Sequence, residues 1–105
     1  MTAFAGTAVV YEQFTGASIE GNAPFEYKEI ILFLDATADD GDTQTVTLSD
    51  YGITTLYFVK GYTHTTEGSV IIEEAPTTSV SEGVLTITVG GSTDNKARAF
   101  LIGGI

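Results

Sequence analysis

The stretch EYKEIILFLD, residues 26–35, contains the longest unbroken apolar run of the sequence and has the largest influence on the predicted fold class. It begins with polar residues and becomes entirely apolar from Ile30 to Leu34. This pattern is typical of a β-strand that passes from a sheet edge into an interior buried on both faces of the strand. A membrane-spanning helix needs about 20 apolar residues, so the run does not predict a membrane span.

Apolar residues recur at a spacing of two along most of the remaining chain. The runs are rich in β-branched and aromatic residues and are bounded by Gly, Asp and Ser, which indicates short strands joined by turns. The further strands that we predict are residues 7–14, 43–48, 53–64 with a break or bulge at Gly61, 69–74, 84–89 and 96–103. The last two flank the turn-rich segment 90–95 and predict a β-hairpin, whereas residues 75–83 predict a loop.

About seven to eight short strands at even spacing predict an all-β fold, either an antiparallel β-sandwich or a small barrel, immunoglobulin-like or jelly-roll-like. The 105 residues are 43% hydrophobic and 17% charged, which is enough apolar material for a core of their own. We therefore expect residues 1–105 to form one β-sandwich domain.

The chain is strongly acidic, with a formal net charge of −10. Lys28, Lys60, Lys96 and Arg98 are its only basic residues besides one histidine. Affinity for nucleic acids comes largely from cations that neutralise phosphates, so we expect neither nucleic acid nor an anionic membrane as a partner. The N-terminal residues MTAFAGTAVV lack the basic and apolar regions of a secretory signal, and we expect synthesis in a cytoplasm.

Four aspartates in the segment LDATADDGDTQ raise the question of a calcium site: Asp35, Asp39, Asp40 and Asp42. An EF-hand loop that started at Asp35 would have Val46 where the last ligand, a glutamate, is required. Asp and Gly also favour turns, because short side chains bond to nearby backbone and Gly tolerates left-handed geometry. We interpret the segment as a solvated turn, with a looser calcium site between strands as the alternative.

Candidate catalytic residues are few. His64 stands among threonines without a recognisable nucleophile nearby, and the absence of cysteine excludes thiolate chemistry. Glu73 and Glu74 are adjacent, so we expect them either on opposite faces of a strand or at the start of the loop at Pro76, rather than across a cleft. The segment VGGSTDNK lacks the Gly-Lys-Ser/Thr ending of a phosphate-binding loop. The sequence predicts no enzyme, no catalytic residue, no cofactor and no metal ligand.

A carbohydrate-binding module is a second alternative, because aromatic side chains on a sheet face can stack on sugars. The candidates for such a platform are Tyr11, Tyr27, Tyr51, Tyr57, Phe58 and Tyr62, and strand alternation is expected to bury at least half of them.

The chain as a whole resembles the small virion proteins of tailed bacteriophages, above all the capsid decoration (cement) proteins. The resemblance is carried by length, the all-strand pattern, acidity, the absence of cysteine and the Thr/Gly-rich ending LTITVGGSTDNKARAFLIGG. It implies a structural protein without enzymatic activity that binds the outer capsid surface and stabilises the shell. The implied partner is the major capsid protein. Self-association as a trimer is favoured, although some members of the family are monomeric. The implied location is the virion exterior after synthesis in the host cytoplasm.

The apolar ends MTAFAGTA and AFLIGGI are the expected assembly interface, because exposed termini are usually polar. Such surface is buried only when the protein binds its partner. The alternative is that both ends are edge strands of the domain's own sheet. The candidate interface residues are Phe4, Phe100, Leu101, Ile102 and Ile105.

Overall fold

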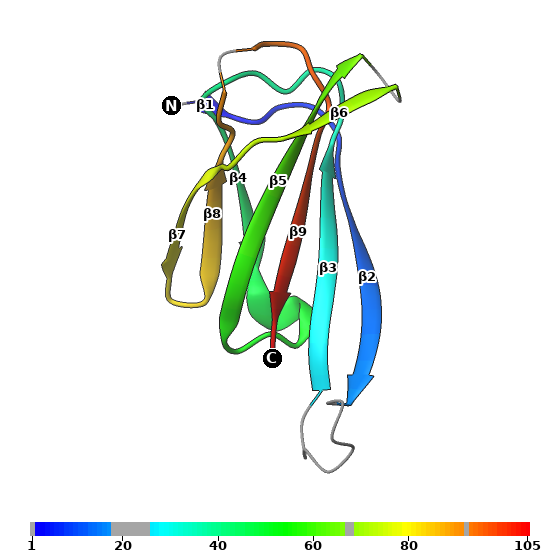
Figure 1. Ribbon diagram of the computed structural model, residues 1–105. Coiled ribbons are helices and arrows are strands. Elements are labelled where there is room, and N and C mark those ends of the chain that lie inside the picture. The colour runs from blue at the N-terminus through cyan, green and yellow to red at the C-terminus, as the bar shows by residue number, and fades with distance from the viewer. Residues whose placement is uncertain (1, 18–25, 67–68, 92) are drawn as a thin grey trace.

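Two facing β-sheets make up the molecule, as the computed structural model shows for residues 2–17, 26–66, 69–91 and 93–105 (Figure 1). The larger sheet has five strands in the order β2-β3-β9-β5-β6, and every pair in it is antiparallel. Its strands are β2 (Ala8–Ala17), β3 (Glu26–Leu34), β9 (Arg98–Gly104), β5 (Leu56–Thr66) and β6 (Val70–Glu73).

The smaller sheet has the order β1-β4-β8-β7. Its strands are β1 (Thr2–Ala3), β4 (Asp42–Thr47), β8 (Val84–Thr88) and β7 (Thr77–Ser81). The short β1 pairs in parallel with β4, and the other two pairs are antiparallel. The predicted all-β sandwich is therefore confirmed.

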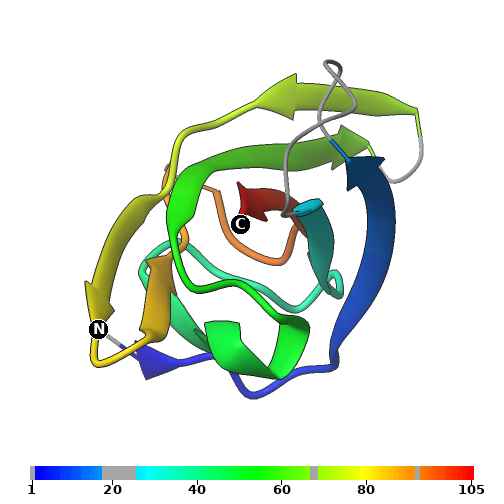
Figure 2. The same cartoon turned by 90° about the horizontal axis from the view of Figure 1, so that it is seen from below.

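The chain itself passes from one sheet to the other along both open sides of the sandwich. β1 and β2 are consecutive, and each is an edge of its own sheet; the same is true of β6 and β7. Viewed along the strands, the two sheets consequently close into a flattened ring (Figure 2). We call the β6–β7 side the Pro76 seam, because Pro76 lies in the short segment between these two strands.

The core lies between the two sheets and is almost entirely aliphatic. In the register of β3 with β9, Ile30 lies opposite Ile102 and Leu32 lies opposite Phe100, and all four side chains are buried. Side chains from β4 and β8 face them, as period-two alternation requires. The smaller sheet and the segments around it contribute Ala38, Val46, Leu48, Ile53, Leu85, Ile87 and Val89.

A 3₁₀ helix, η1 (Leu48–Tyr51), closes one end of the ring between β4 and β5. Leu48 is buried there, and Gly52 ends the helix in the left-handed region with φ 74°. The C-terminal residue is tied to the same end, because the Ile105 amide donates to the Thr55 carbonyl at 3.0 Å and the Ile105 carbonyl accepts from the Thr54 and Thr55 amides.

The predicted hairpin between β8 and β9 is wrong. β8 pairs with β4 and β7, whereas β9 lies at the centre of the other sheet between β3 and β5. Between β8 and β9 the chain therefore passes from the smaller sheet to the larger one instead of reversing within one sheet. A turn-rich composition predicts that the chain changes direction, but it does not determine which strand the next segment joins.

The predicted loop at residues 75–83 is also wrong, because it contains β7. All five residues of β7 are exposed, so no alternation of buried and exposed positions marked the strand in the sequence. β7 joins β8 through Glu82 and Gly83, which both have positive φ, as a tight two-residue hairpin turn requires.

The bulge predicted at Gly61 is not there. β5 is continuous through Gly61, and its register irregularities fall between Leu56 and Phe58 and between His64 and Thr66. Gly61 instead permits a close approach at the Pro76 seam. A Cβ atom there would lie 2.5 Å from the Glu74 carbonyl oxygen and 3.0 Å from Pro76 Cδ.

Candidate functional site

The outer face of the five-stranded sheet is largely apolar. Residues directly opposite one another in an antiparallel pair share a face, and neighbours along a strand alternate. Because Ile30 and Leu32 point into the core, Ile31 and Phe33 point outward, where their partners are Leu101 and Ala99. The centre of the sheet therefore presents apolar side chains away from the core.

The same face continues onto the flanking strands. On β2, Tyr11 lies opposite Ile31, and on β5, Tyr62 lies opposite Ala99. On β6, Ile71 lies opposite His64. We call this set the outer face; its apolar members are Val9, Tyr11, Ile31, Phe33, Phe58, Tyr62, Ile71, Ala99 and Leu101.

No described element packs on the outer face. Its members are absent from the core cluster, and the strand contacts on this side lie within the sheet itself. Tyr11 is 58% exposed and Ile71 is 54% exposed, while the central residues Ile31, Phe33 and Leu101 are half-buried by their neighbours. A sheet normally buries its apolar face against another layer, and an uncovered apolar patch marks an interaction surface.

The expectation that β3 is buried on both faces is therefore wrong. One face of β3 lies in the core, and the other, with Ile31 and Phe33, belongs to the exposed outer face. The sequence indicated both apolar faces of β3, because consecutive apolar residues on a strand place apolar side chains on both of its faces. Burying both faces needs two covering layers. The described residues supply one covering layer, so the second face of β3 stays uncovered by them.

The five predicted interface residues do not lie together. Phe100 and Ile102 are 2% and 0% exposed, so these two core side chains are unable to contact a partner in this fold. Phe4 is half-buried against the core and Ile105 lies at the opposite end of the ring. Only Leu101 belongs to the outer face. The alternative of two edge strands holds for β1, but the C-terminal strand β9 is central.

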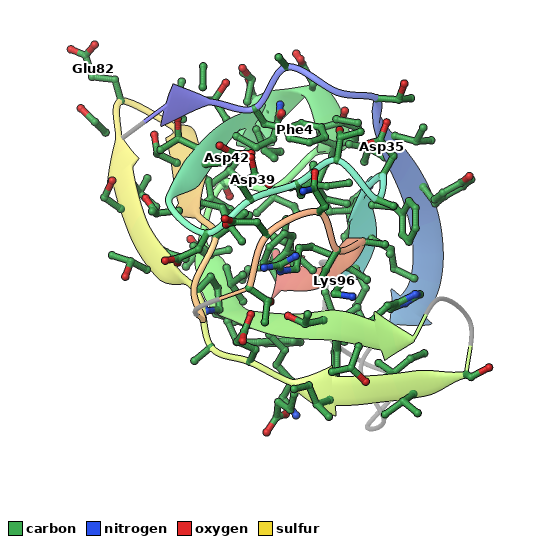
Figure 3. All side chains as sticks on the ribbon, turned by 90° about the horizontal axis from the view of Figure 1, so that it is seen from above. Phe4, Asp35, Asp39, Asp42, Glu82 and Lys96 are labelled. Carbon is green, nitrogen blue, oxygen red and sulfur yellow. The ribbon has the colours of Figure 1, made fainter. Side chains whose placement is uncertain are left out.

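The aspartates of the acidic segment gather at the end of the ring beside the N-terminal segment (Figure 3). Asp35 accepts hydrogen bonds from the Thr37 hydroxyl, from the Thr7 amide at 2.8 Å and from the Thr37 amide at 3.0 Å. These donors, the Thr37 hydroxyl first, lower the pKa of the Asp35 carboxyl below its ordinary value. Asp35 thus fastens the N-terminal segment to the loop that follows β3.

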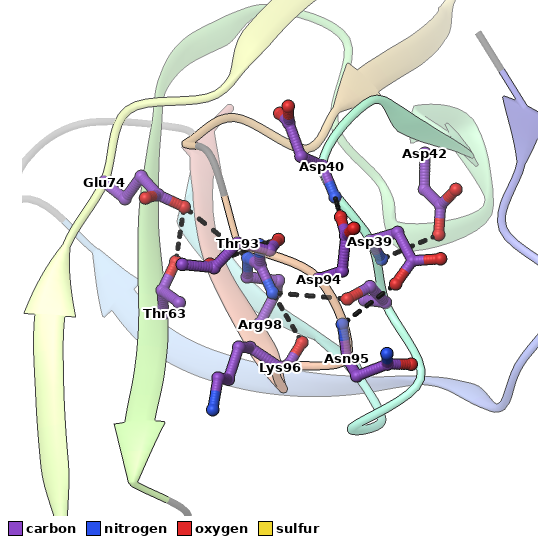
Figure 4. Close-up of polar contacts among 11 residues, drawn as sticks. Asp39, Asp40, Asp42, Thr63, Glu74, Thr93, Asp94, Asn95, Lys96 and Arg98 are labelled. Carbon is purple, nitrogen blue, oxygen red and sulfur yellow. Dashed lines mark hydrogen bonds and ion pairs between the residues drawn. The ribbon is translucent and has the colours of Figure 1, made fainter.

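The other aspartates have comparable roles in turns (Figure 4). Asp42 accepts from the Asp39 amide at 2.9 Å, and Asp39 in turn accepts from the Asn95 amide at 2.9 Å. Asp94 accepts from the Asp40 amide at 3.2 Å. Within the described residues, no three acidic or histidine side chains converge as a metal site requires. These contacts support the interpretation of the segment as a turn.

An open pocket of about 370 Å³ lies between the N-terminal segment and the acidic loop. Small side chains and backbone form most of its wall, and the two carboxylates in it already accept the hydrogen bonds described above. The lining offers no cation, and its one hydroxyl, that of Thr37, donates to Asp35. Its residues are Ala3, Ala5, Gly6, Thr37, Asp39 and Asp42.

A buried arginine holds the loop between β8 and β9 (Figure 4). Arg98 is 1% exposed and donates to the Lys96 carbonyl at 2.6 Å and to the Thr93 carbonyl at 2.9 Å. Its Nε lies 3.5 Å from Glu74 Oε1, an ion pair whose geometry does not meet that of a hydrogen bond. The same carboxylate accepts from the Thr63 hydroxyl at 2.5 Å. This cluster joins β9 to the Pro76 seam.

The structure also places the remaining residues singled out in the sequence. Glu73 is exposed while Glu74 turns toward Arg98. His64 lies on the outer face with its ring 6.0 Å from that of Phe33, and its buried Nδ1 has no partner among the described residues. His64 therefore contributes ring surface to the outer face.

The six aromatic residues do not form one platform. Tyr11, Phe58 and Tyr62 lie on the outer face, but Tyr51 packs against the core from η1. Tyr57 is 56% exposed beside the register shift in β5. The side chain of Tyr27 lies outside the described residues.

Within the described part of the chain, no helix has the length and apolar character needed to cross a membrane. Comparison of the chain with protein-family models, with curated proteins and with solved structures gives no match, so its function is inferred from the surface itself.

Proposed function

We propose that this protein is a structural protein-binding module, and specifically a capsid decoration protein of a tailed bacteriophage. The observation that carries the protein-binding role is the uncovered apolar outer face. The resemblance of the whole sequence to small phage virion proteins supports the more specific assignment. The proposed partner is the major capsid protein, and the proposed self-association is a trimer on the capsid exterior.

The outer face suits attachment to a preformed protein surface. It is carried by five hydrogen-bonded strands above an aliphatic core, so little conformational entropy remains to be lost on binding. Fully burying one large apolar side chain contributes roughly 1.5–3 kcal/mol. Lys60 and Glu73 lie on the same side of the sheet and supply polar groups beside the apolar centre, as protein interfaces commonly have.

The charge of the protein favours the same role. A net charge of −10 on 105 residues keeps copies apart while the outer face is uncovered. The free protein is therefore expected to stay soluble until it meets a complementary surface.

The second candidate is carbohydrate binding on the same face. It is favoured by the ring of Tyr11, which is exposed on the outer face and is able to stack on a sugar. The two candidates differ in the area that they use, because a sugar covers one or two rings whereas a protein lattice covers several strands.

Co-sedimentation with capsids that lack their decoration protein tests the proposal. Wild-type protein is expected to sediment with the shells at micromolar concentration. Tyr11→Glu and Leu101→Glu are expected to weaken binding about tenfold or more, because each puts a charge into the buried interface. Val80→Glu is the matched control, since Val80 is 50% exposed on β7 and lies off the outer face.

Thermal melting of the free proteins separates binding from folding. Tyr11→Glu should melt close to wild type. If wild-type protein stays in the supernatant, or if Val80→Glu impairs binding as much as Tyr11→Glu, the decoration role is wrong. Saturable binding of a glycan that Tyr11→Ala abolishes, without capsid binding, would establish the carbohydrate module instead.

A further inference from the structure

We infer that β6 accepts an additional β-strand, contributed by a basic, extended segment of another protein. This site lies at the edge of the five-stranded sheet, whereas the proposed capsid contact uses its face. Different variants test strand addition at β6 and capsid binding by the outer face, so each proposal can be contradicted without the other.

β6 is an open and apolar edge. It pairs with β5 on one side, and no described strand pairs with it on the other. Val70, Ile71 and Ile72 are 47%, 54% and 44% exposed. Among the described side chains of the edge strands, only β6 has three consecutive large apolar residues that are all exposed. Native edges are usually blunted by lysine or proline, and residues 70–73 contain neither.

The hydrogen bonds of β5 show which backbone groups of β6 point outward. The Gly61 carbonyl accepts from the Glu74 amide at 2.8 Å, and the His64 amide donates in the opposite direction, to the Ala97 carbonyl, at 3.0 Å. Odd-numbered residues of this part of β5 therefore face β6, and even-numbered residues face β9. Since backbone direction alternates along an antiparallel strand, Ile72 bonds to Thr63 of β5.

The groups left for a further strand belong to Ile71 and Glu73. Each of these residues directs its amide and its carbonyl away from β5, and their side chains both lie on the outer face. An added strand that bonds to both residues would extend the five-stranded sheet and enlarge the outer face by one strand. This mode of binding takes its affinity from backbone hydrogen bonds and its selectivity from side chains.

The side chains of β6 define the chemistry of the added strand. Opposite Ile71 and Ile72 it needs apolar residues, and opposite Glu73 it needs lysine or arginine. A second copy of this chain fits less well, because two molecules of charge −10 would meet at an edge that carries Glu73. The occupant that the edge favours is consequently a segment with a valine- or isoleucine-rich centre and basic flanks.

Hydrogen exchange followed by NMR tests the backbone assignment directly. In the free protein the amide of Ile72 should be protected, while those of Ile71 and Glu73 should exchange quickly. A short synthetic peptide with a valine run between lysines should protect Ile71 and Glu73 on titration. The same peptide with glutamates in place of lysines should bind at least about tenfold more weakly. Protection elsewhere, or equal binding of both peptides, would overturn the inference.

Three variants make the test specific. Ile71→Pro removes the Ile71 side chain and an amide that points away from β5, so it should abolish peptide binding while the pairing of β6 with β5 and the melting temperature change little. Ile71→Ala keeps that amide, and this variant should still bind the lysine-containing peptide detectably. Glu73→Lys should reverse the preference between the two peptides. Retained binding by a folded Ile71→Pro protein would contradict strand addition, and a dimer of the free protein that this variant dissolves would show that the occupant is a second copy.

Discussion

Asp35 shows how one carboxylate organises the N-terminal part of the molecule. It is a surface residue, yet it receives hydrogen bonds from two backbone amides and a hydroxyl. One of those amides belongs to Thr7, so the bond holds the segment between β1 and β2 in place. The strength of these hydrogen bonds depends on the ionisation of Asp35, because a protonated carboxyl is a weaker acceptor than a carboxylate.

We predict that Asp35→Asn lowers the melting temperature at pH 7 and that the difference from wild type disappears in acid. Because the folded pKa lies below the ordinary value of 3.8, the contribution is fully present above the unfolded pKa. It is lost as the pH falls through the lower folded pKa. Melting curves between pH 7 and pH 2 would measure this, with Asp40→Asn, an exposed neighbour, as the control. A constant difference across that range would contradict the prediction.

Arg98 and Glu74 form the second residue pair whose removal has a clear expected result. Glu74→Ala leaves the buried guanidinium without its counterion and should lower the free energy of unfolding by about 3 kcal/mol. This is the lower end of the range for broken buried ion pairs, because Glu74 is partly exposed. Glu73→Ala is the matched control and should change stability by less than about 0.5 kcal/mol. Urea unfolding measures both. Equal stability of the two variants would show that the ion pair is not needed.

At the scale of elements, the Pro76 seam depends on the absence of a side chain at Gly61. We predict that Gly61→Ala destabilises the protein by about 1–3 kcal/mol, because the added methyl group would meet the Glu74 carbonyl and Pro76. Lys60→Ala, one residue away and exposed, should have little effect. Urea unfolding of both variants checks this, and unchanged stability of Gly61→Ala would mean that the seam moves aside freely.

The elements themselves were predictable to different degrees. β3, β4, β5, β6, β8 and β9 were expected close to their observed bounds, because alternation or an apolar run marks each of them. β7 was missed because an exposed edge strand of Thr and Ser has the composition of a loop. The pairing of β9 was missed because it is decided by contacts with β3 and β5, which are distant in sequence.

At the scale of the whole molecule, the candidate site could be predicted only in part from the sequence. The run from Ile30 to Leu34 indicated two apolar faces, but the sequence does not state how many layers the fold provides. Phe100 and Ile102 were predicted to be surface residues because they lie near the end of the given sequence. They are buried in the core because β9 is a central strand. Arg98 was not singled out, since its partners come from three separate loops and strands.

The central place of β9 also sets the order of events when the protein is made. A ribosome delivers β3 and β5 well before β9, yet these two strands meet only through β9. During synthesis the hairpins that contain them have no common sheet, and Leu32 and Val59 lack their neighbours Phe100 and Ile102 on β9. The five-stranded sheet is thus incomplete until β9 emerges. The arrival of β9 joins the two hairpins into one sheet in a single cooperative step. Partly folded forms of the domain are therefore disfavoured.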